Sequence, residues 1–202
     1  HAYDPTGTDY VRMTKAIIRD PAAFYHVVWW CDTEQTGTSG NDRWKIYVNG
    51  DLQELETPSG YNGEPAEDTE LGINDSGLHR IGKFSTSYFD GCLSEIHFVD
   101  GETKTPSDFA ETDSNGQWVP KEYAGSYGTN GFHLDFADSS DLGADAAGSN
   151  DFTASDVTQL TDSPSAGRNH ATWNPLTNDI GTLTEGNLKA DGTDNCSYQG
   201  TL

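Results

Sequence analysis

Short apolar segments recur along the chain, and loops rich in Gly, Asn, Asp, Ser and Thr separate them. The apolar segments are aromatic and β-branched, which is typical of β-strands. Strands are expected at residues 24–31, 43–48, 78–81, 88–99 and 132–136. After residues 43–48, Asn49-Gly50 followed by Asp51-Leu52 predicts a tight hairpin turn, because both central residues of such a turn need positive φ. The pattern therefore predicts an all-β fold.

Helical signals are weak by comparison. No stretch of the sequence keeps an apolar period of about 3.6 residues over several turns. Short helices are expected only at residues 106–111, with Thr105 or Ser107 as the cap, and at residues 12–18.

The expected strand at residues 88–99 is apolar on both faces in patches. Alternation places Glu95 and His97 on one face and Ile96 and Phe98 on the other. Neither face is cleanly polar, which suits a two-sheet antiparallel sandwich covered on one face and partly on the other.

The amino-acid composition of the sequence changes toward the C-terminus. A chain of 202 residues is long enough for one β domain with a remainder. We expect a sandwich over residues 1–153, an extended linker over residues 154–185, and the start of a second β domain over residues 186–202.

The net charge of the chain limits the classes of binding partner that we expect. The chain carries 33 acidic residues against 11 Lys plus Arg, a formal net charge of −22. Such a charge repels phosphate backbones, so nucleic acid is not an expected partner. No apolar run approaches the about 20 residues of a membrane helix, so membrane insertion is not expected either. The acidic excess fits a solvated surface, a saline habitat or divalent-cation sites.

The cysteines do not indicate a zinc site or a disulfide framework. Cys31, Cys92 and Cys196 are an odd number without C-x-x-C spacing. Cys31 and Cys92 lie in apolar segments and are expected to be buried as small hydrophobic side chains.

Several segments together resemble a known family. In chain order they read FYHVVWWCD, WKIYVNGD, HRIGKF, YFDGCLSEIHFVDGETKTPSDFAE and GQWVPKEYAGSYGTNGFHLDFAD. This set resembles the laminin-G-like, concanavalin-A-like jelly-roll domains, in particular those of phage and marine virus structural proteins such as tail-fibre-like and particle-surface proteins. The resemblance covers roughly residues 10–153. It implies that strands which precede residue 10 in the family are missing from this sequence.

The resemblance implies a non-catalytic module of a viral or phage particle surface protein, located on the virion surface or outside the cell. Expected partners are virion or fibre subunits, further copies of the chain, and cell-surface glycan. A secreted carbohydrate-binding adhesion protein is the alternative, because a fold does not name its function.

A glycoside hydrolase is a less favoured reading. Sandwiches of this kind also host glucanases, which carry paired carboxylates on one strand, and retaining hydrolysis needs those groups about 5 Å apart. The sequence contains no E-x-D-x-E strand. Its acidic run at residues 64–70 reads as a solvated loop, and Glu95 and His97 read as structural.

Calcium is the expected ion, if one binds. Laminin-G-like domains often hold Ca²⁺ at the sandwich rim, and Ca²⁺ prefers oxygen ligands. Asp32 and Asp90 are the candidate ligands, because each ends or interrupts an apolar run.

Aromatic side chains in Gly-rich loops are the candidate ligand-binding residues, because sugar rings stack on Tyr and Trp. The candidates are Tyr61, Tyr123 and Tyr127. The adjacent Trp29 and Trp30 must point to opposite faces of their strand, so at most one can fill the core.

Overall fold

The computed structural model describes residues 1–20, 23–36 and 43–159, together with the backbone of the strand residues 172–173, 182–184, 189–191 and 200–201. In chain order the elements are β1 (Ala2–Tyr3), β2 (Asp9–Tyr10), β3 (Met13–Thr14), β4 (Val27–Cys31), β5 (Trp44–Val48), β6 (Asp51–Leu52), β7 (Leu55–Glu56), β8 (Lys83–Phe84), β9 (Ser87–Tyr88), β10 (Ile96–Phe98), α1 (Pro106–Phe109), β11 (Ala110–Thr112), β12 (Trp118–Pro120), β13 (Phe132–Leu134), β14 (Thr172–Trp173), β15 (Thr182–Thr184), β16 (Lys189–Asp191) and β17 (Gly200–Thr201).

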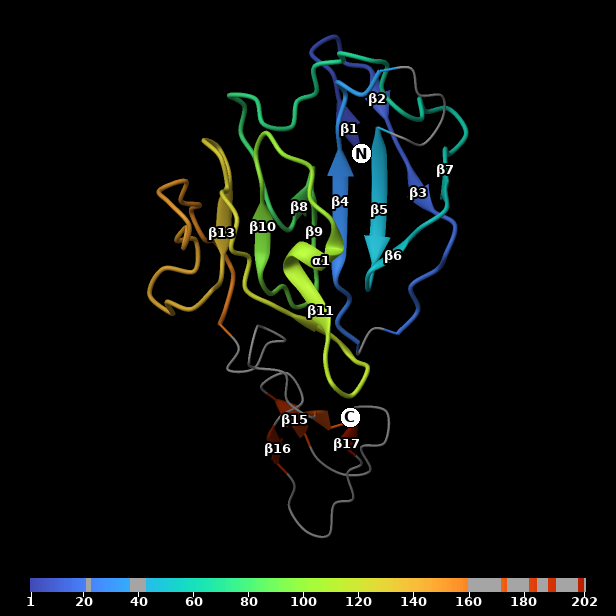
Figure 1. The fold of residues 1–202 in the computed structure, drawn as a ribbon. Coiled ribbons are helices and arrows are strands. Elements are labelled where there is room, and N and C mark those ends of the chain that lie inside the picture. The colour runs from blue at the N-terminus through green and yellow to red at the C-terminus, as the bar shows by residue number, and fades with distance from the viewer. Residues whose placement is uncertain are drawn as a thin grey trace.

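The fold is nearly all-β, as the sequence predicts, and its sheets are small and antiparallel (Figure 1). The largest has the order β4-β5-β6, and β10 pairs with β13 across a long stretch of chain. The four-residue helix α1 is the only helix among the described residues, and it is too short to cross a membrane.

The β5–β6 turn follows the local chemistry that the sequence predicts. Asn49 has φ of 50° and Gly50 has φ of 89°, the left-handed conformations that such hairpins need. Asn49 also holds the start of β4, because its side-chain oxygen accepts the N–H of His26 at 2.9 Å. The turn therefore ties the start of β4 to the end of β5, which face each other at one end of the pair.

Trp44 forms the centre of the core. It is 2% exposed and lies diagonally across the ladder from Trp29, with ring centroids 5.4 Å apart. Trp30 points to the other face of β4, where the ammonium of Lys45 lies 4.5 Å from its ring centroid. The opposite orientation of the two adjacent tryptophans follows from strand alternation, and the fully buried tryptophan comes from the neighbouring strand.

The acidic loop at residues 64–70 is not simply solvated, which corrects the expectation from sequence. The Glu64 carboxylate accepts the backbone N–H of Arg43, and the Glu67 carboxylate lies 3.5 Å from the guanidinium of that residue. Because Arg43 is 8% exposed, the Glu67 carboxylate balances a buried cation, while Glu64 holds the backbone of the same residue. The loop thereby anchors the start of β5.

Three further expectations about elements are wrong. Residues 12–18 do not form a helix, because β3 pairs with β7 and residue Lys15 extends that pairing through Glu54. Residues 78–81 form no strand. The single strand expected at residues 88–99 is interrupted, since β9 ends at Tyr88 and β10 begins at Ile96.

Of the two caps that the sequence offers, Thr105 and Ser107, the structure uses Thr105. Thr105 precedes α1, and its backbone N–H donates to the Asp108 carboxylate at 2.7 Å. The same carboxylate accepts the Thr105 hydroxyl at 2.8 Å. These bonds lower the pKa of Asp108, the backbone N–H of Thr105 having the largest effect.

The expected linker and second domain lie largely outside the described residues. In the segment expected to form the linker and the second domain, β14 pairs with β17 and β15 pairs with β16. Of the cysteines, Cys31 is half-buried, whereas Cys92 is exposed, so the expected burial of Cys92 is wrong. Burial, followed by the charges of Asp32 and Glu64, raises the pKa of Cys31 to about 11.

Candidate functional site

The pairing of β10 with β13 brings two histidines together. His97 and His133 lie directly opposite one another in the ladder, so their side chains share a face. Their rings stack with centroids 4.2 Å apart and an interplanar angle of 15°. Both are flanked by apolar residues on their strands, which turn toward the other face.

Glu95 completes this group from the residue before β10. Its carboxylate oxygen Oε2 lies 2.7 Å from His133 Nε2 and 3.9 Å from His97 Nε2. Glu95 has φ of 50°, an uncommon conformation for a residue with a side chain. That backbone kink interrupts the expected long strand and places the carboxylate beside both rings.

Tyrosine and phenylalanine rings surround His97. The Tyr127 hydroxyl lies 2.7 Å from His97 Nδ1, and the Phe109 ring centroid is 5.1 Å from the imidazole. Tyr123 packs edge-on against Tyr127 at 5.1 Å, and its hydroxyl donates to the Ser126 carbonyl. The side chain of His97 is consequently only 13% exposed.

This environment shifts the acid–base properties of His97 and Tyr127. Burial lowers the pKa of His97 to about 4, assisted by nearby His133 and opposed by Glu95. Burial also raises the pKa of Tyr127 to about 12, with further contributions from Tyr123 and Glu95. At neutral pH His97 is therefore uncharged and the Tyr127 hydroxyl keeps its proton.

Asp145 holds β13 in position through the backbone of that strand. It is 8% exposed, and its carboxylate accepts the backbone N–H groups of His133 at 2.9 Å, Ala147 at 2.9 Å and Asn150 at 3.0 Å. Burial would raise the pKa of Asp145, but these hydrogen bonds outweigh it and lower the pKa. The carboxylate is thus a structural anchor that holds the backbone of His133.

Glu95, His97 and His133 form the one group of three or more ligand-type side chains that converge within 4.8 Å in the described part of the chain. Two imidazoles and a carboxylate can transfer protons or hold a cation. We name these three residues the Glu-His-His cluster.

Two of the predicted ligand-binding tyrosines, Tyr123 and Tyr127, pack against each other, whereas Tyr61 lies beside His1. Tyr61 is 47% exposed and lies near His1, with ring centroids 6.2 Å apart. Tyr123 is buried, which leaves its ring without an open face for a sugar, and Tyr127 is engaged by His97. Of the three residues, Tyr61 keeps the exposure that a stacking platform needs.

The predicted calcium ligands Asp32 and Asp90 are not part of a convergent group of three or more ligand-type side chains among the described residues. Asp32 accepts the backbone N–H of Glu34 at 3.1 Å, and Asp90 is exposed. Calcium binding at these positions stays a prediction.

His133 is the member of the cluster that sequence reasoning did not single out. The signal was present as two segments of the same form, Ile96-His97-Phe98 and Phe132-His133-Leu134, each with one histidine between apolar residues. Pairing these segments in register would have placed the histidines side by side. Their register depends on distant parts of the chain, so the pairing could not be read locally.

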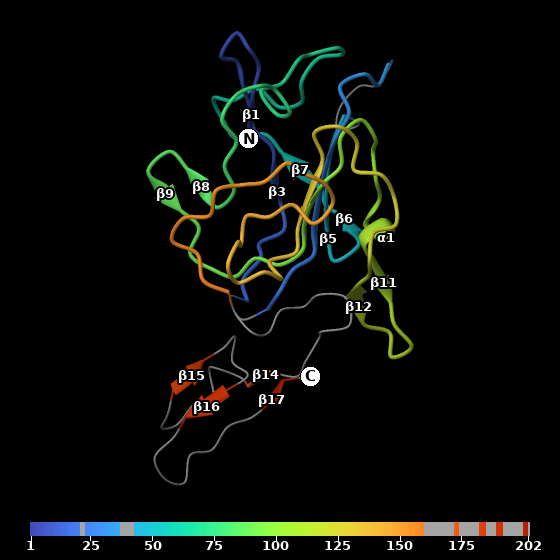
Figure 2. The ribbon, with the colours of Figure 1, turned by 90° about the vertical axis from the view of Figure 1, so that its left-hand side faces the viewer.

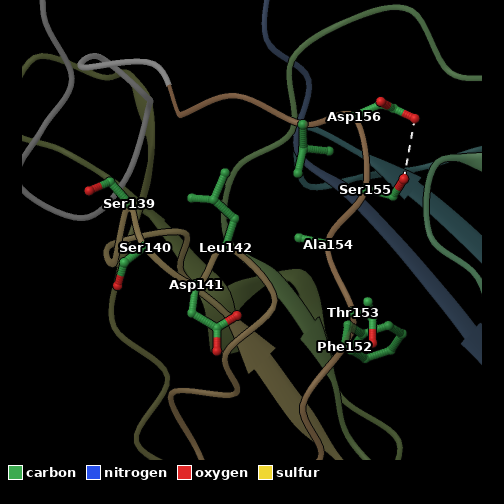
Figure 3. Close-up of a pocket in the computed structure, with 10 residues that line it drawn as sticks. Ser139, Ser140, Asp141, Leu142, Phe152, Thr153, Ala154, Ser155 and Asp156 are labelled. Carbon is green, nitrogen blue, oxygen red and sulfur yellow. Dashed lines mark hydrogen bonds between the residues drawn. The ribbon is translucent and has the colours of Figure 1, made fainter.

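A shallow hollow of about 470 Å³ lies beyond β13, between residues 139–142 and 152–157 (Figure 3). Its polar side chains bond locally, as where the Ser155 hydroxyl donates to the Asp156 carboxylate at 3.2 Å. The lining has no histidine, lysine or arginine, so it lacks the chemistry of the Glu-His-His cluster.

Comparisons with family models, with curated proteins and with solved structures gave no match for this chain.

Proposed function

We propose that this chain is a non-catalytic assembly domain of a particle or fibre surface, which contacts further copies of itself through an exposed apolar hairpin. The hairpin comprises residues 78–93 and includes β8 and β9; we call it the apolar hairpin. The resemblance of residues 10–153 to laminin-G-like jelly-roll domains of viral and phage structural proteins supports this proposal. The antiparallel sheets β4-β5-β6 and β10-β13 are compatible with a two-sheet jelly roll.

The exposure of the apolar hairpin carries the proposal. It presents a run of large apolar side chains, namely Leu78 at 77% exposed, Ile81 at 37%, Phe84 at 61%, Tyr88 at 70%, Phe89 at 56% and Leu93 at 45%. Single exposed apolar residues are ordinary, but so many within one short segment are typical of an interaction surface. Figure 2 shows β8 and β9 at one side of the fold, away from α1.

Charge favours another copy of this acidic chain as the partner. Within residues 78–93 the charged side chains are Arg80, Lys83 and Asp90, which gives two cations minus one carboxylate, a local charge of +1. The whole chain carries −22, so the hairpin is a locally basic patch on an acidic molecule. The hairpin itself therefore complements the acidic surface of a second copy, although the net charge of the two copies still repels.

The expected affinity of a single contact is modest. Full burial of one large apolar side chain contributes about 1.5–3 kcal/mol. Association costs about 4–15 kcal/mol of translational and rotational freedom. Full burial of the six exposed side chains of the hairpin would contribute about 9–18 kcal/mol. One hairpin contact therefore exceeds the cost of association by a small margin at most, and a repeated array would gain from multivalency.

Sedimentation velocity of the full chain over a range of concentrations tests the proposal. We expect concentration-dependent self-association that the double substitution Leu78→Asp/Phe84→Asp abolishes. The matched control Ile17→Asp/Val157→Asp adds the same charge at residues that are 71% and 57% exposed, and should associate like the unaltered chain. A chain that stays monomeric, or equal loss in both double variants, would contradict the proposal.

Glycan binding is the second candidate, and one group of aromatic residues favours it. The His1 ring lies 4.5 Å from Tyr3 and 5.5 Å from Phe84, with the exposed Tyr61 beside it. If the chain is monomeric but binds sugars saturably on a glycan array, and Tyr61→Ala removes that binding, the adhesion function replaces assembly.

A further inference from the structure

The geometry points to a binding site for a divalent transition-metal ion, best suited to Zn²⁺, at the Glu-His-His cluster. This site is separate from the apolar hairpin and independent of the assembly function. It is also chemically distinct from the expected calcium site at Asp32 and Asp90, which would use oxygen ligands alone.

The spacing of the ligand atoms is the first argument. A tetrahedral Zn²⁺ holds its ligands at about 2.0–2.2 Å, which places neighbouring ligand atoms about 3.3 Å apart. Glu95 Oε2 lies 2.7 Å from His133 Nε2 and 3.9 Å from His97 Nε2, and the three ligand atoms lie within 4.8 Å of one another. An imidazole nitrogen binds a metal in the plane of its ring, so the two stacked rings, which lie 15° from parallel, must rotate toward one another for both Nε2 atoms to meet one ion.

The types of ligand atom are the second argument. Two imidazole nitrogens and one carboxylate oxygen suit Zn²⁺ and its neighbours in the transition series, whereas Ca²⁺ and Mg²⁺ take oxygen ligands. Three protein ligands leave one tetrahedral position open for water. Solvent can reach the cluster, because the side chains of Glu95, His97 and His133 are 23%, 13% and 21% exposed.

The support around the ligands is the third argument. Metal-bound histidines commonly use their second ring nitrogen to bond an outer group, which orients the ring. Tyr127 occupies His97 Nδ1 at 2.7 Å, and this leaves Nε2 directed at Glu95. Asp145 holds the backbone of His133, and the pairing of β10 with β13 places His97 directly opposite it.

A simple hydrogen bond between Glu95 and His133 accounts for less of this arrangement. It explains the 2.7 Å contact between those two residues. It does not explain why His97, stacked on His133, also turns Nε2 toward the same carboxylate while Tyr127 holds its other nitrogen. A shared cation would draw both Nε2 atoms and the carboxylate to one point, and it would offset the cost of partly burying a carboxylate.

Calorimetric titration of the full, EDTA-treated chain with Zn²⁺ tests the inference. We expect one saturable site, and at least a tenfold loss of affinity in Glu95→Gln and in His133→Gln. Controls are His79→Gln and His1→Gln, because histidines elsewhere on the surface can bind transition ions weakly; both should keep the site. Titration with Co²⁺ adds a spectroscopic readout, since a tetrahedral site gives intense visible absorption.

Tyr127→Phe provides a variant that keeps the ring and removes only the hydroxyl. We expect about a tenfold loss of Zn²⁺ affinity, as for other outer-group substitutions, with an unchanged circular dichroism spectrum. The inference is overturned if the unaltered chain shows no saturable Zn²⁺ site. It is equally overturned if folded Glu95→Gln and His133→Gln bind Zn²⁺ as the controls do.

Discussion

The contact between His26 and Trp118 is the clearest residue-scale link between protonation and structure outside the Glu-His-His cluster. The indole N–H of Trp118 donates to His26 Nδ1 at 3.1 Å. An indole nitrogen can only donate, so His26 Nδ1 must be unprotonated for this bond to form. Burial correspondingly lowers the pKa of His26 below its ordinary value of 6.5.

Acidification should therefore destabilise the fold through His26. Below about pH 6.5 the unfolded chain binds a proton at this residue that the folded chain does not, so stability falls with pH until the folded-state pKa is passed. Urea unfolding followed by tryptophan fluorescence between about pH 8 and pH 5 would measure this. The nearby His97 also titrates, so His26→Gln serves as the comparison; an equal pH dependence in both chains would contradict the assignment to His26.

At the scale of elements, the β5–β6 hairpin couples turn geometry to packing. Gly50 has φ of 89°, and a Cβ added there would lie 3.3 Å from the Trp118 ring. Trp118 in turn contacts His26, whose backbone N–H is held by Asn49. The turn, β12 and the start of β4 consequently form one packed unit.

Gly50→Ala should cost more stability than Gly60→Ala. Both glycines have positive φ, but a Cβ at Gly60 would meet no atom within 4 Å among the residues described. Backbone strain alone costs about 1–2 kcal/mol at such positions. The free energy of unfolding of each variant would be measured in urea. The amount by which Gly50→Ala loses more than Gly60→Ala then reports the steric crowding between the added Cβ and the Trp118 ring. Equal losses would show that the indole moves aside freely.

Interactions between residues close in sequence predict the cap of α1, but they do not predict where β10 begins. Thr105 and Asp108 lie three positions apart, and their bonding depends on residues in sequence proximity. The start of β10 depends on the positive φ of Glu95, which a carboxylate drawn toward His133 stabilises from outside the segment. Strand alternation alone therefore predicted a continuous strand where the chain bends.

At the scale of the whole molecule, net charge opposes both compaction and association. A formal charge of −22 on 202 residues produces general self-repulsion, which salt screens. At about 0.1 M salt the screening length is about 10 Å, and it shortens to about 3 Å at about 1 M. The acidic surface and the apolar hairpin thus act in opposite directions on self-association.

Raising NaCl to about 1 M should increase the melting temperature and strengthen self-association. NaCl is preferable to sulfate, because sulfate also strengthens apolar burial directly. Thermal scans and sedimentation velocity at matched protein concentrations would measure the two effects. Sucrose provides a control for a cosolute without charge screening. If neither the melting temperature nor the self-association changed with NaCl, the acidic residues would be too dispersed to repel one another.

The sequence by itself determined the all-β character, the Asn49-Gly50 turn and the Thr105 cap, because steric limits and hydrogen bonds between near neighbours decide these features. It also indicated that Trp29 and Trp30 point apart, since alternation is a property of any strand. Only the tertiary structure decided that Trp44 fills the core, that Glu67 pairs with the Arg43 guanidinium and that Glu64 accepts the Arg43 backbone N–H. The Glu-His-His cluster likewise required the register of β10 against β13, because that register depends on burial and pairing over the whole fold.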